Sequence, residues 1–328
     1  MGKWKVFVTR RLPSPAEEIL AAECEAVFFG EDRPITRAEL LDGVRGVDGL
    51  IALLSDTIDG QVMDAAGPRL RVIANYAVGF NNIDVAEATR RGILVTNTPG
   101  VLTEATADLT WALIMSTARR VVEGDAYMRS GQFNGWSPTL LLGQEVYGKT
   151  LGVVGFGRIG QAVARRAKGF NMRVLYYSRR RVPEAEAELG AEYRELDQLL
   201  AESDFVSLHV PLTDQTRHLI GRRELELMKP TAILVNVARG PVVDEAALVE
   251  VLRQGRIAGA GFDVYEEEPK MAPGLAELSN VVLLPHLGSA TRETRAKMAE
   301  MVATDLLEAL RGRRPPHLVN PEAWKESH

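Results

Sequence analysis

A run of ten residues, Leu151–Gly160, constrains the fold of this chain more than any other feature of the sequence. It reads LGVVGFGRIG, so that three glycines follow a short apolar stretch at the spacing G-x-G-x-x-G. The apolar stretch predicts a buried strand, and the residues from Ile159 onward predict a helix. We therefore expect a strand, a tight turn and a helix in direct succession, as in a parallel α/β layer.

The three glycines of this turn suggest a phosphate site. Gly155 permits the tight turn, Gly157 lets a pyrophosphate approach the backbone, and Gly160 lets the helix pack close to the strand. The helix N-terminus adds N–H groups and a positive dipole end. The spacing alone is a weak signal, and a plain turn without ligand is the alternative. The strand before it and the helix after it favour a dinucleotide site.

Short β-branched runs alternate with helical patterns along most of the 328 residues, a length typical of two domains. We expect an α/β fold: a Rossmann-type doubly wound parallel sheet after residue 150, and a smaller flavodoxin-like α/β unit before residue 100. The predicted strands of the smaller unit are 5–9, 49–53, 70–75 and 93–96, and those of the larger are 150–154, 173–177, 205–209, 232–237, 259–263 and 281–284. The predicted helices include 15–23, 36–41, 61–66, one long helix over 103–129, and 292–311.

Composition excludes several classes of protein. Lys and Arg number 39 and Asp and Glu 44, and the resulting net charge of −5 argues against nucleic-acid or membrane-surface binding. The single cysteine, Cys24, forms no internal disulfide and no cysteine zinc cage, and we expect no metal site. No apolar run reaches 18 residues and no signal-peptide core begins the chain, so we expect a cytoplasmic location.

The residues after the second predicted strand bear on cofactor choice. An acid that binds the ribose 2′-hydroxyl is expected about 20 residues past the glycine turn, but Ser178, Arg179, Arg180 and Arg181 stand there. A hydroxyl and guanidinium groups suit a 2′-phosphate, whereas a carboxylate would repel it. NADP(H) is therefore favoured and NAD(H) remains possible. A solvated basic turn is the alternative, above all for Arg180 and Arg181.

Polar groups follow several predicted strands at their carboxyl ends, where open α/β sheets bind ligands. Arg239, the acidic run 266–268 and a histidine, either His209 or His286, can meet there. An Arg that pairs with a carboxylate, a His that donates a proton and an acid that keeps this His protonated suit hydride transfer to a 2-oxo acid. Each group also has a structural alternative, and position alone does not choose between the two histidines.

Motifs along nearly the whole chain resemble those of the D-isomer-specific 2-hydroxyacid dehydrogenases, with the glyoxylate/hydroxypyruvate reductase branch as the most similar. They occur in that family's order, and they are NYAVGFNNID at 75–84, GFGRIG at 155–160, HVPLT at 209–213, NVARG at 236–240, GFDVYEEEP at 261–269 and PHLG at 285–288. The resemblance implies that Arg239 binds the substrate carboxylate, that His286 is the general acid/base, and that Glu268 hydrogen-bonds His286. It also implies that the backbone N–H groups of Val78 and Gly79 hold the substrate carboxylate.

The same resemblance implies further assignments. Trp136 matches a residue that a neighbouring subunit contributes near the substrate, which implies a homodimer, although a simple interface aromatic is the alternative. The substrate domain is expected to comprise residues 1–100 and 290–328, and the dinucleotide domain residues 101–289. Positions that line the cofactor site match Thr106, Gly155, Phe156, Gly157, Arg158, Ile159, Gly160, Ser178, Arg179, Arg180, Pro211, Thr216, Val237, Ala238, Asp263 and Gly288.

The activity implied is reduction of glyoxylate or hydroxypyruvate to glycolate or D-glycerate with NAD(P)H. D-3-phosphoglycerate and D-lactate dehydrogenases share the Arg, Glu and His and are the alternatives within the family. Formate-oxidising members use Gln where Glu268 stands, so Glu268 favours a hydroxy acid. A nucleotide-sensing, corepressor-like scaffold is the alternative outside enzymes, because a fold alone does not fix a function.

Overall fold

The computed structural model describes residues 2–325 of the chain. It divides into two compact units, the first formed by Met1–Leu102 and Ala290–His328 and the second by Thr103–Ser289. Each unit is built around its own parallel sheet. The chain leaves the first unit once and returns to it at the end, so the first unit is discontinuous in sequence.

The first unit contains five parallel strands in the order β2-β1-β3-β4-β5. This is the strand order of flavodoxin-like sheets, and the predicted fold class of the smaller unit is confirmed. The central strands β3 and β4 are buried at every residue because helices cover both faces. The strands are β1 (Trp4–Val8), β2 (Cys24–Phe28), β3 (Gly49–Ala52), β4 (Val72–Asn75) and β5 (Leu94–Thr96).

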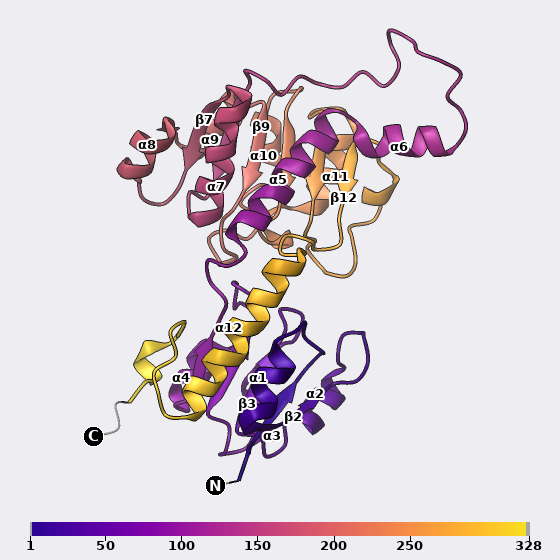
Figure 1. The fold of residues 1–328 in the computed structure, drawn as a ribbon. Coiled ribbons are helices and arrows are strands. Elements are labelled where there is room, and N and C mark those ends of the chain that lie inside the picture. The colour runs from indigo at the N-terminus through magenta and orange to yellow at the C-terminus, as the bar shows by residue number, and fades with distance from the viewer. Residues whose placement is uncertain (1, 326–328) are drawn as a thin grey trace. The chain divides into compact units, whose positions relative to one another are not determined.

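Two apolar cores lie on the two faces of this sheet. One core includes residues of the long last helix, α12, and of α1, and the other includes residues of α2, α3 and α4. Figure 1 shows α12 running beside the strands of the first unit. The helices are α1 (Ala16–Glu23), α2 (Arg37–Gly43), α3 (Gly60–Ala66), α4 (Val85–Arg90) and α12 (Arg292–Leu310), with a short 3-10 helix, η4, at Pro321–Ala323.

The sequence prediction missed β2 and α4. Cys24 ends α1 and is already extended, so β2 follows the helix with no Gly or Pro to mark the change. As an edge strand β2 also exposes an apolar residue, Val27, which weakens its hydrophobic alternation. Helix α4 is short and depends on Asp84, whose side chain accepts a hydrogen bond from the Glu87 N–H and caps the first turn.

The second unit contains seven parallel strands in the order β12-β11-β10-β9-β6-β7-β8. Counted from β6, the order is the doubly wound Rossmann arrangement with one additional strand at the edge, which confirms the predicted fold class. The strands are β6 (Thr150–Val154), β7 (Arg173–Tyr177), β8 (Ala191–Tyr193), β9 (Phe205–Leu208), β10 (Ile233–Asn236), β11 (Gly259–Phe262) and β12 (Val281–Leu283).

Helices cover both faces of this sheet. Residues of α5, α7 and α8 contribute to the core on one face, and residues of α9, α10 and α11 to the core on the other (Figure 1). The helices are α5 (Thr103–Ala118), α6 (Val121–Arg129), α7 (Arg158–Ala167), α8 (Pro183–Leu189), α9 (Leu196–Glu202), α10 (Arg222–Leu227) and α11 (Glu245–Arg253). Short 3-10 helices lie at η1 (Lys168–Phe170), η2 (Gly240–Val242) and η3 (Leu275–Glu277).

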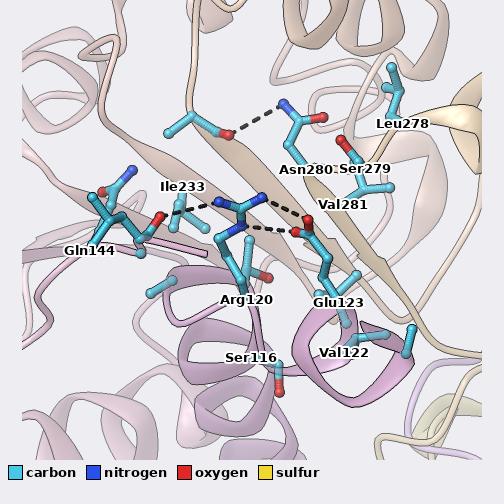
Figure 2. A pocket seen from close by; sticks show the side chains of 17 residues that line it. Ser116, Arg120, Val122, Glu123, Gln144, Ile233, Leu278, Ser279, Asn280 and Val281 are labelled. Atoms are coloured by element: carbon cyan, nitrogen blue, oxygen red, sulfur yellow. Dashed lines mark hydrogen bonds and ion pairs between the residues drawn. The ribbon is translucent and has the colours of Figure 1, made fainter. Parts of the chain in front are cut away.

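The prediction of one helix over 103–129 is wrong, because the chain breaks between α5 and α6. Arg120 adopts a left-handed backbone conformation with φ of 52°, which ends the helix. Its guanidinium pairs with Glu123 and reaches the Leu142 carbonyl (Figure 2). The returning chain satisfies the end of α5, where the Gln144 N–H donates to the Ala118 carbonyl at 2.7 Å.

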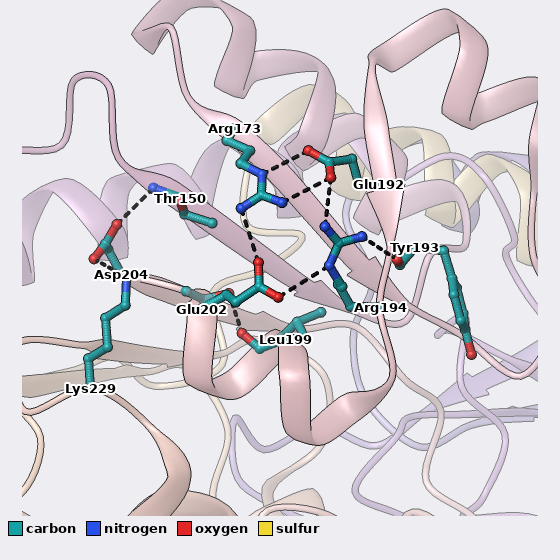
Figure 3. A network of polar contacts seen from close by, with 10 residues as sticks. Thr150, Arg173, Glu192, Tyr193, Arg194, Leu199, Glu202, Asp204 and Lys229 are labelled. Atoms are coloured by element: carbon teal, nitrogen blue, oxygen red, sulfur yellow. Dashed lines mark hydrogen bonds and ion pairs between the residues drawn. The ribbon is translucent and has the colours of Figure 1, made fainter.

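The strand β8 was also missed, since it has only three residues and lies at the sheet edge. A ring of two arginines and two glutamates fastens it. Arg173 of β7 binds Glu192 of β8 through two parallel hydrogen bonds of 2.8 and 2.9 Å, and Glu202 of α9 at 3.0 Å (Figure 3). Arg194 contacts both glutamates from the other side, so the ring joins β7, β8 and α9. Hydrogen bonds from Arg173 lower the pKa of Glu192 to about 2.

Two structural findings concern residues 2–325 as a whole. None of their helices combines the length and the apolar character needed to cross a bilayer. Their His, Cys, Asp and Glu side chains form no group of three or more that could hold a metal ion. Cys24 is a buried free thiol, and burial raises its pKa to about 11.

We expect Arg173→Leu to lower the free energy of unfolding at pH 7 by no more than ~1 kcal/mol, because the ring is exposed to solvent and screened. The lowered pKa of Glu192 stabilises the fold above pH 4.5, and this contribution is lost as pH falls toward about 2. Urea unfolding of both proteins across this range measures the difference. The assignment is contradicted if the difference in unfolding free energy persists at pH 2, or if 1 M salt does not reduce it.

Candidate active site

All seven strands of the second unit are parallel, so their carboxyl ends meet along one edge of the sheet. The strand order changes direction between β9 and β6, which is the position where open α/β sheets bind ligands. From β12 to β7 this edge carries, in order, His286, Asp263 with the segment of Glu268, Arg239, Pro211, the glycine turn and Ser178. Four strand spacings of roughly 4.8 Å separate β11 from β7, about 19 Å, which suits an extended ligand.

The glycine turn has the geometry of a phosphate cradle. Gly155 adopts φ of 98°, and a side chain there would meet the backbone of His209 at 2.7 Å. A Cβ on Gly160 would lie 2.2 Å from the Gly155 carbonyl, so helix and strand pack too closely for any side chain. At Gly157, by contrast, a Cβ would meet nothing within 4 Å. The backbone there is open to a ligand directly at the N-terminus of α7, and the turn fits the pyrophosphate of a dinucleotide.

Neighbouring residues of the turn divide into exposed and buried groups. Arg158 is exposed at the first position of α7. Phe156 is buried and stacks on Tyr176 with ring centroids 4.1 Å apart, so its side chain serves the core and only its backbone can meet a ligand. Val237 and Ala238 are buried in the same way at the end of β10.

The turn after β7 holds three arginines in different states. Arg181 forms an ion pair with Glu186 at 2.7 Å, and its guanidinium lies 5.6 Å from the Tyr193 ring centroid. Arg179 and Arg180 are exposed. The Ser178 hydroxyl donates to the Arg180 carbonyl, which tightens the turn. Arg181 therefore fastens the turn to α8, while Arg179 and Arg180 extend from it into solvent.

At the other end of the sheet edge, His286 and Glu268 form a hydrogen-bonded pair. The distance from His286 Nδ1 to Glu268 Oε2 is 3.0 Å, and the side chains are 27% and 31% exposed. The second carboxylate oxygen of Glu268 accepts the Tyr265 N–H at 3.1 Å. With Nδ1 engaged in this way, Nε2 is the ring nitrogen left to face a substrate.

The backbone around His286 is constrained by Asp263. His286 has a left-handed conformation with φ of 57°, which is uncommon for a residue with a side chain. Its N–H donates to the Asp263 carbonyl at 2.9 Å, and the Asp263 carboxylate accepts the N–H groups of Leu287 at 2.6 Å and Gly288 at 2.8 Å. Thr106 completes the support, since its hydroxyl donates to the Gly288 carbonyl at 3.0 Å.

The charges at this end of the sheet depend on one another. Burial opposes ionisation of Glu268, but the hydrogen bond and charge of His286, the Tyr265 N–H and the charge of Arg239 outweigh it and lower the pKa of Glu268. Burial also lowers the pKa of Arg239, and the Glu268 charge acts in the opposite direction. For Asp263, burial raises the pKa, although the Leu287 N–H, His286 and the Gly288 N–H oppose it. Glu268 is therefore an ionised acceptor at neutral pH.

The two histidines at this sheet edge have different surroundings. His209 is enclosed at the end of β9, where its Nε2 lies 2.6 Å from the Ser207 hydroxyl. Burial lowers its pKa to about 3, so its imidazole is neutral at physiological pH. His286, in contrast, is accessible and has a carboxylate partner. Of these two histidines, His286 is the one whose ring contacts a carboxylate.

The remaining predicted residues occupy two further places. Thr216 donates its hydroxyl to the carbonyl of Pro211 at 2.6 Å and folds the segment after β9 into a turn. In the first unit, the side-chain amide of Asn97 donates to the Val78 carbonyl at 2.7 Å, and that of Asn75 to the Gly79 carbonyl at 2.8 Å. Neither asparagine was predicted as a site residue, although Asn75 ends β4 and Asn97 directly follows β5. Substrate binding by Val78 and Gly79 stays a prediction.

One hollow of the second unit lies away from these groups. It has a volume of about 450 Å³ and is lined by residues next to the amino ends of β10, β11 and β12, including Ile233, Ala258 and Val281 (Figure 2). Arg120 and Glu123 occupy it as a pair. The hollow is therefore at the opposite ends of these strands from the glycine turn and His286.

A parallel sheet with a phosphate cradle at its switch point, and with Arg, Glu and His at the adjoining strand ends, defines a nicotinamide-dinucleotide-dependent oxidoreductase. Residues 111–288 match the family model described as "D-isomer specific 2-hydroxyacid dehydrogenase, NAD binding domain". The chain belongs to the D-isomer-specific 2-hydroxyacid dehydrogenase family. The family resemblance seen in the sequence motifs is thereby confirmed.

Three relatives place the chain within this family. A glyoxylate reductase from Thermococcus gammatolerans is 58% identical over 327 residues, which cover 98% of both chains. The crystal structure of a glyoxylate reductase from Paecilomyes thermophila is 34% identical, with a TM-score of 0.87 over 97% of this chain and 99% of that chain. An NADPH-dependent glyoxylate/hydroxypyruvate reductase from Sinorhizobium meliloti, in complex with NADP and malonate, is 32% identical, with a TM-score of 0.87 and complete coverage of both chains.

Proposed function

We propose that this protein reduces glyoxylate, and related small 2-oxo acids such as hydroxypyruvate, to the corresponding 2-hydroxy acids with NADPH. The observation that carries the proposal is the hydrogen bond between His286 and the ionised Glu268, with Arg239 beside them and the phosphate cradle along the same sheet edge. The relative from T. gammatolerans, 58% identical over nearly the full length, is named a glyoxylate reductase and supports this choice of substrate.

Each charged side chain has one role in the proposed reaction. Arg239 binds the carboxylate of the 2-oxo acid with its planar guanidinium. His286 donates the proton that the carbonyl oxygen needs as the adjacent carbon is reduced. Glu268 holds Nδ1 of His286, which orients the ring. The nicotinamide, when bound, supplies the hydride.

The cofactor fits the residues along the sheet edge. The cradle at Gly157 and the N-terminus of α7 would hold its pyrophosphate. Asp263 and Thr106 flank the His286 segment and would lie toward its nicotinamide end. Pro211 and Thr216, at the end of β9, would line the site between these ends.

Glyoxylate-dependent oxidation of NADPH, followed by absorbance, tests the proposed function. Glu268→Gln removes the negative charge that contacts Nδ1 of His286, so we expect kcat to fall at least about tenfold and the alkaline limb of the pH profile to move to lower pH. Glu250→Gln, on exposed α11 surface, is the matched control and should change neither. Cofactor binding without turnover in the unaltered protein would identify a nucleotide-sensing scaffold and would refute the proposal.

NADP(H) preference is proposed from the turn after β7. Arg179 and Arg180 extend into solvent beside Ser178, and no carboxylate occupies the position of a ribose-binding acid. A 2′-phosphate would therefore meet two guanidinium groups and a hydroxyl. The S. meliloti relative, whose structure contains NADP, supports this assignment.

We expect replacement of both Arg179 and Arg180 by Ala to raise KM for NADPH by roughly tenfold or more, because two charge-assisted hydrogen bonds are lost. KM for NADH should change by less than about twofold, since that cofactor lacks the 2′-phosphate. Initial rates with both cofactors measure the effect. Arg181→Ala is the control, because Arg181 is occupied by Glu186. An equal loss with NADH would show that the turn does not discriminate.

We propose a homodimer from the exposed apolar residues of α6 and the segment after it. The helix α6 has no buried residue, and it extends with the following segment away from the body of the second unit (Figure 1). Residues 121–147 expose Val121, Val122, Met128, Phe133, Trp136, Leu142 and Tyr147. Trp136 is 84% exposed. Surfaces of this kind mark protein interfaces, and a second copy of the chain is the proposed occupant.

We expect Val122→Asp combined with Leu142→Asp to weaken self-association at least about 100-fold, because each change buries an unpaired charge in the interface. Sedimentation equilibrium of the unaltered protein should give the mass of two chains, and that of the variant the mass of one. Val27→Asp, at an equally exposed valine on β2, is the control. A monomeric unaltered protein would contradict the proposal.

A further inference from the structure

The loop that carries Glu268 is held at two points by one buried carboxylate. Glu245, the first residue of α11, is 2% exposed. Its Oε1 accepts the Glu266 N–H at 2.6 Å and its Oε2 accepts the Ala272 N–H at 3.0 Å. These two amides lie on either side of Glu268, so Glu245 fixes both the beginning and the end of the loop.

A second contact ties the same loop to the segment that follows Arg239. His218 Nε2 lies 2.5 Å from Glu266 Oε1, and the His218 N–H donates to the Pro241 carbonyl at 2.7 Å. The backbones are in close contact as well, because a Cβ on Gly240 would lie 1.8 Å from the carbonyl carbon of Tyr265. The loop of Glu268 and the segment of Arg239 are therefore packed as one piece.

Tyr265 connects the loop to both members of the His286–Glu268 pair. Its N–H donates to Glu268 Oε1 at 3.1 Å, and its hydroxyl donates to the Leu284 carbonyl at 2.9 Å, two residues before His286. Glu268 in turn contacts His286. A continuous series of hydrogen bonds and chain connections thus leads from Glu245, through the loop, to His286.

A helix cap does not account for Glu245. Asp244 already caps α11, since its carboxylate accepts the Ala247 N–H at 2.9 Å. Burying a carboxylate is costly unless its hydrogen bonds compensate. Burial raises the pKa of Glu245; the N–H groups of Glu266 and Ala272 oppose this, and the charges of Glu266 and Glu268 add to it. Both oxygens of the Glu245 carboxyl group accept a loop N–H, and together they bridge the loop.

We infer that Glu245 is a positioning residue that acts through Glu268: by fixing both ends of the loop it sets the distance and angle at which the Glu268 carboxylate meets His286. This inference rests on the proposed function, in which that pair supplies the proton. Glu245 itself touches neither the reacting atoms nor His286. Glu245 instead determines how well Glu268 contacts His286.

Glu245→Gln tests the inference. The side-chain amide keeps one acceptor oxygen but places NH₂ against a backbone N–H, so one end of the loop is released. We expect kcat for glyoxylate reduction to fall roughly three- to tenfold, with KM values for glyoxylate and NADPH unchanged within about twofold. The alkaline limb of the pH profile should move to lower pH, in the direction of Glu268→Gln. Glu250→Gln, on the same helix, should leave rate and profile unchanged.

The charged groups near His286 and Glu268 determine how a shift in the pH profile is interpreted. Glu268 and Asp263 face His286, and Arg239 faces Glu268. Glu266 and Glu268 face Glu245. Asp263 and Arg239 are intact in both Gln variants, so a shared shift in the profile is assigned to Glu268 and its contact with His286.

A double-variant cycle separates positioning from general stability. If Glu245 acts through Glu268, Glu245→Gln adds less than about twofold to the loss already caused by Glu268→Gln. Equal losses in both backgrounds would overturn the inference. If Glu245→Gln does not fold, His218→Gln releases the loop from the exposed side and should shift the profile in the same direction by less. No shift in that variant also counts against the inference.

The cycle also distinguishes failure of the inference from failure of the proposed function. If Glu268→Gln moves the pH profile but neither Glu245→Gln nor His218→Gln does, the proposed function stands and the inference fails. If Glu268→Gln leaves rate and profile unchanged, the assignment of the His286–Glu268 pair fails, and the positioning role fails with it.

Discussion

Parallel pairing of the seven strands in the second unit is the constraint on which the candidate site depends. Because every strand runs in the same direction, residues that are far apart in sequence, such as Gly155, Arg239 and His286, are delivered to one edge of the sheet. The reversal of strand order between β9 and β6 leaves an opening at that edge for the pyrophosphate. The phosphate cradle and the hydrogen-bonded pair then follow from which residues happen to end each strand.

At the end of the sheet edge that carries His286, buried charged groups have partners of opposite charge or backbone N–H groups. Glu268 is stabilised by His286, by Arg239 and by one backbone N–H, and Asp263 by two backbone N–H groups. Each carboxylate therefore has partners that offset its loss of water. The same contacts fix the backbone at His286, whose left-handed conformation would otherwise be unfavourable. One set of hydrogen bonds therefore both stabilises the buried carboxylates and fixes the backbone at His286.

Much of this arrangement could be predicted from the sequence. Strong signals carried the prediction: the glycine spacing after an apolar strand, and family motifs in order, identified the parallel sheets, the strand ends and the pair of His286 with Glu268. Weak signals were missed where tertiary contacts decide local structure. Edge strand β2 is partly exposed, and edge strand β8 has only three residues. The break at Arg120 depends on a residue as distant as Gln144, which satisfies the end of α5. Likewise, nothing in the local sequence of Glu245 indicates that it binds two amides 21 and 27 residues away.

The two ends of the sheet edge differ in how much substitution they can accommodate. Around Arg239 and Glu268 the backbones are so close that Gly240 admits no side chain. At the far end, Arg179 and Arg180 lie in solvent on a turn that Arg181 and Ser178 help to fasten. Changes to that turn would not propagate into the packed region. In such a protein, the preference for NADP(H) or NAD(H) can change during evolution without a change in the reaction.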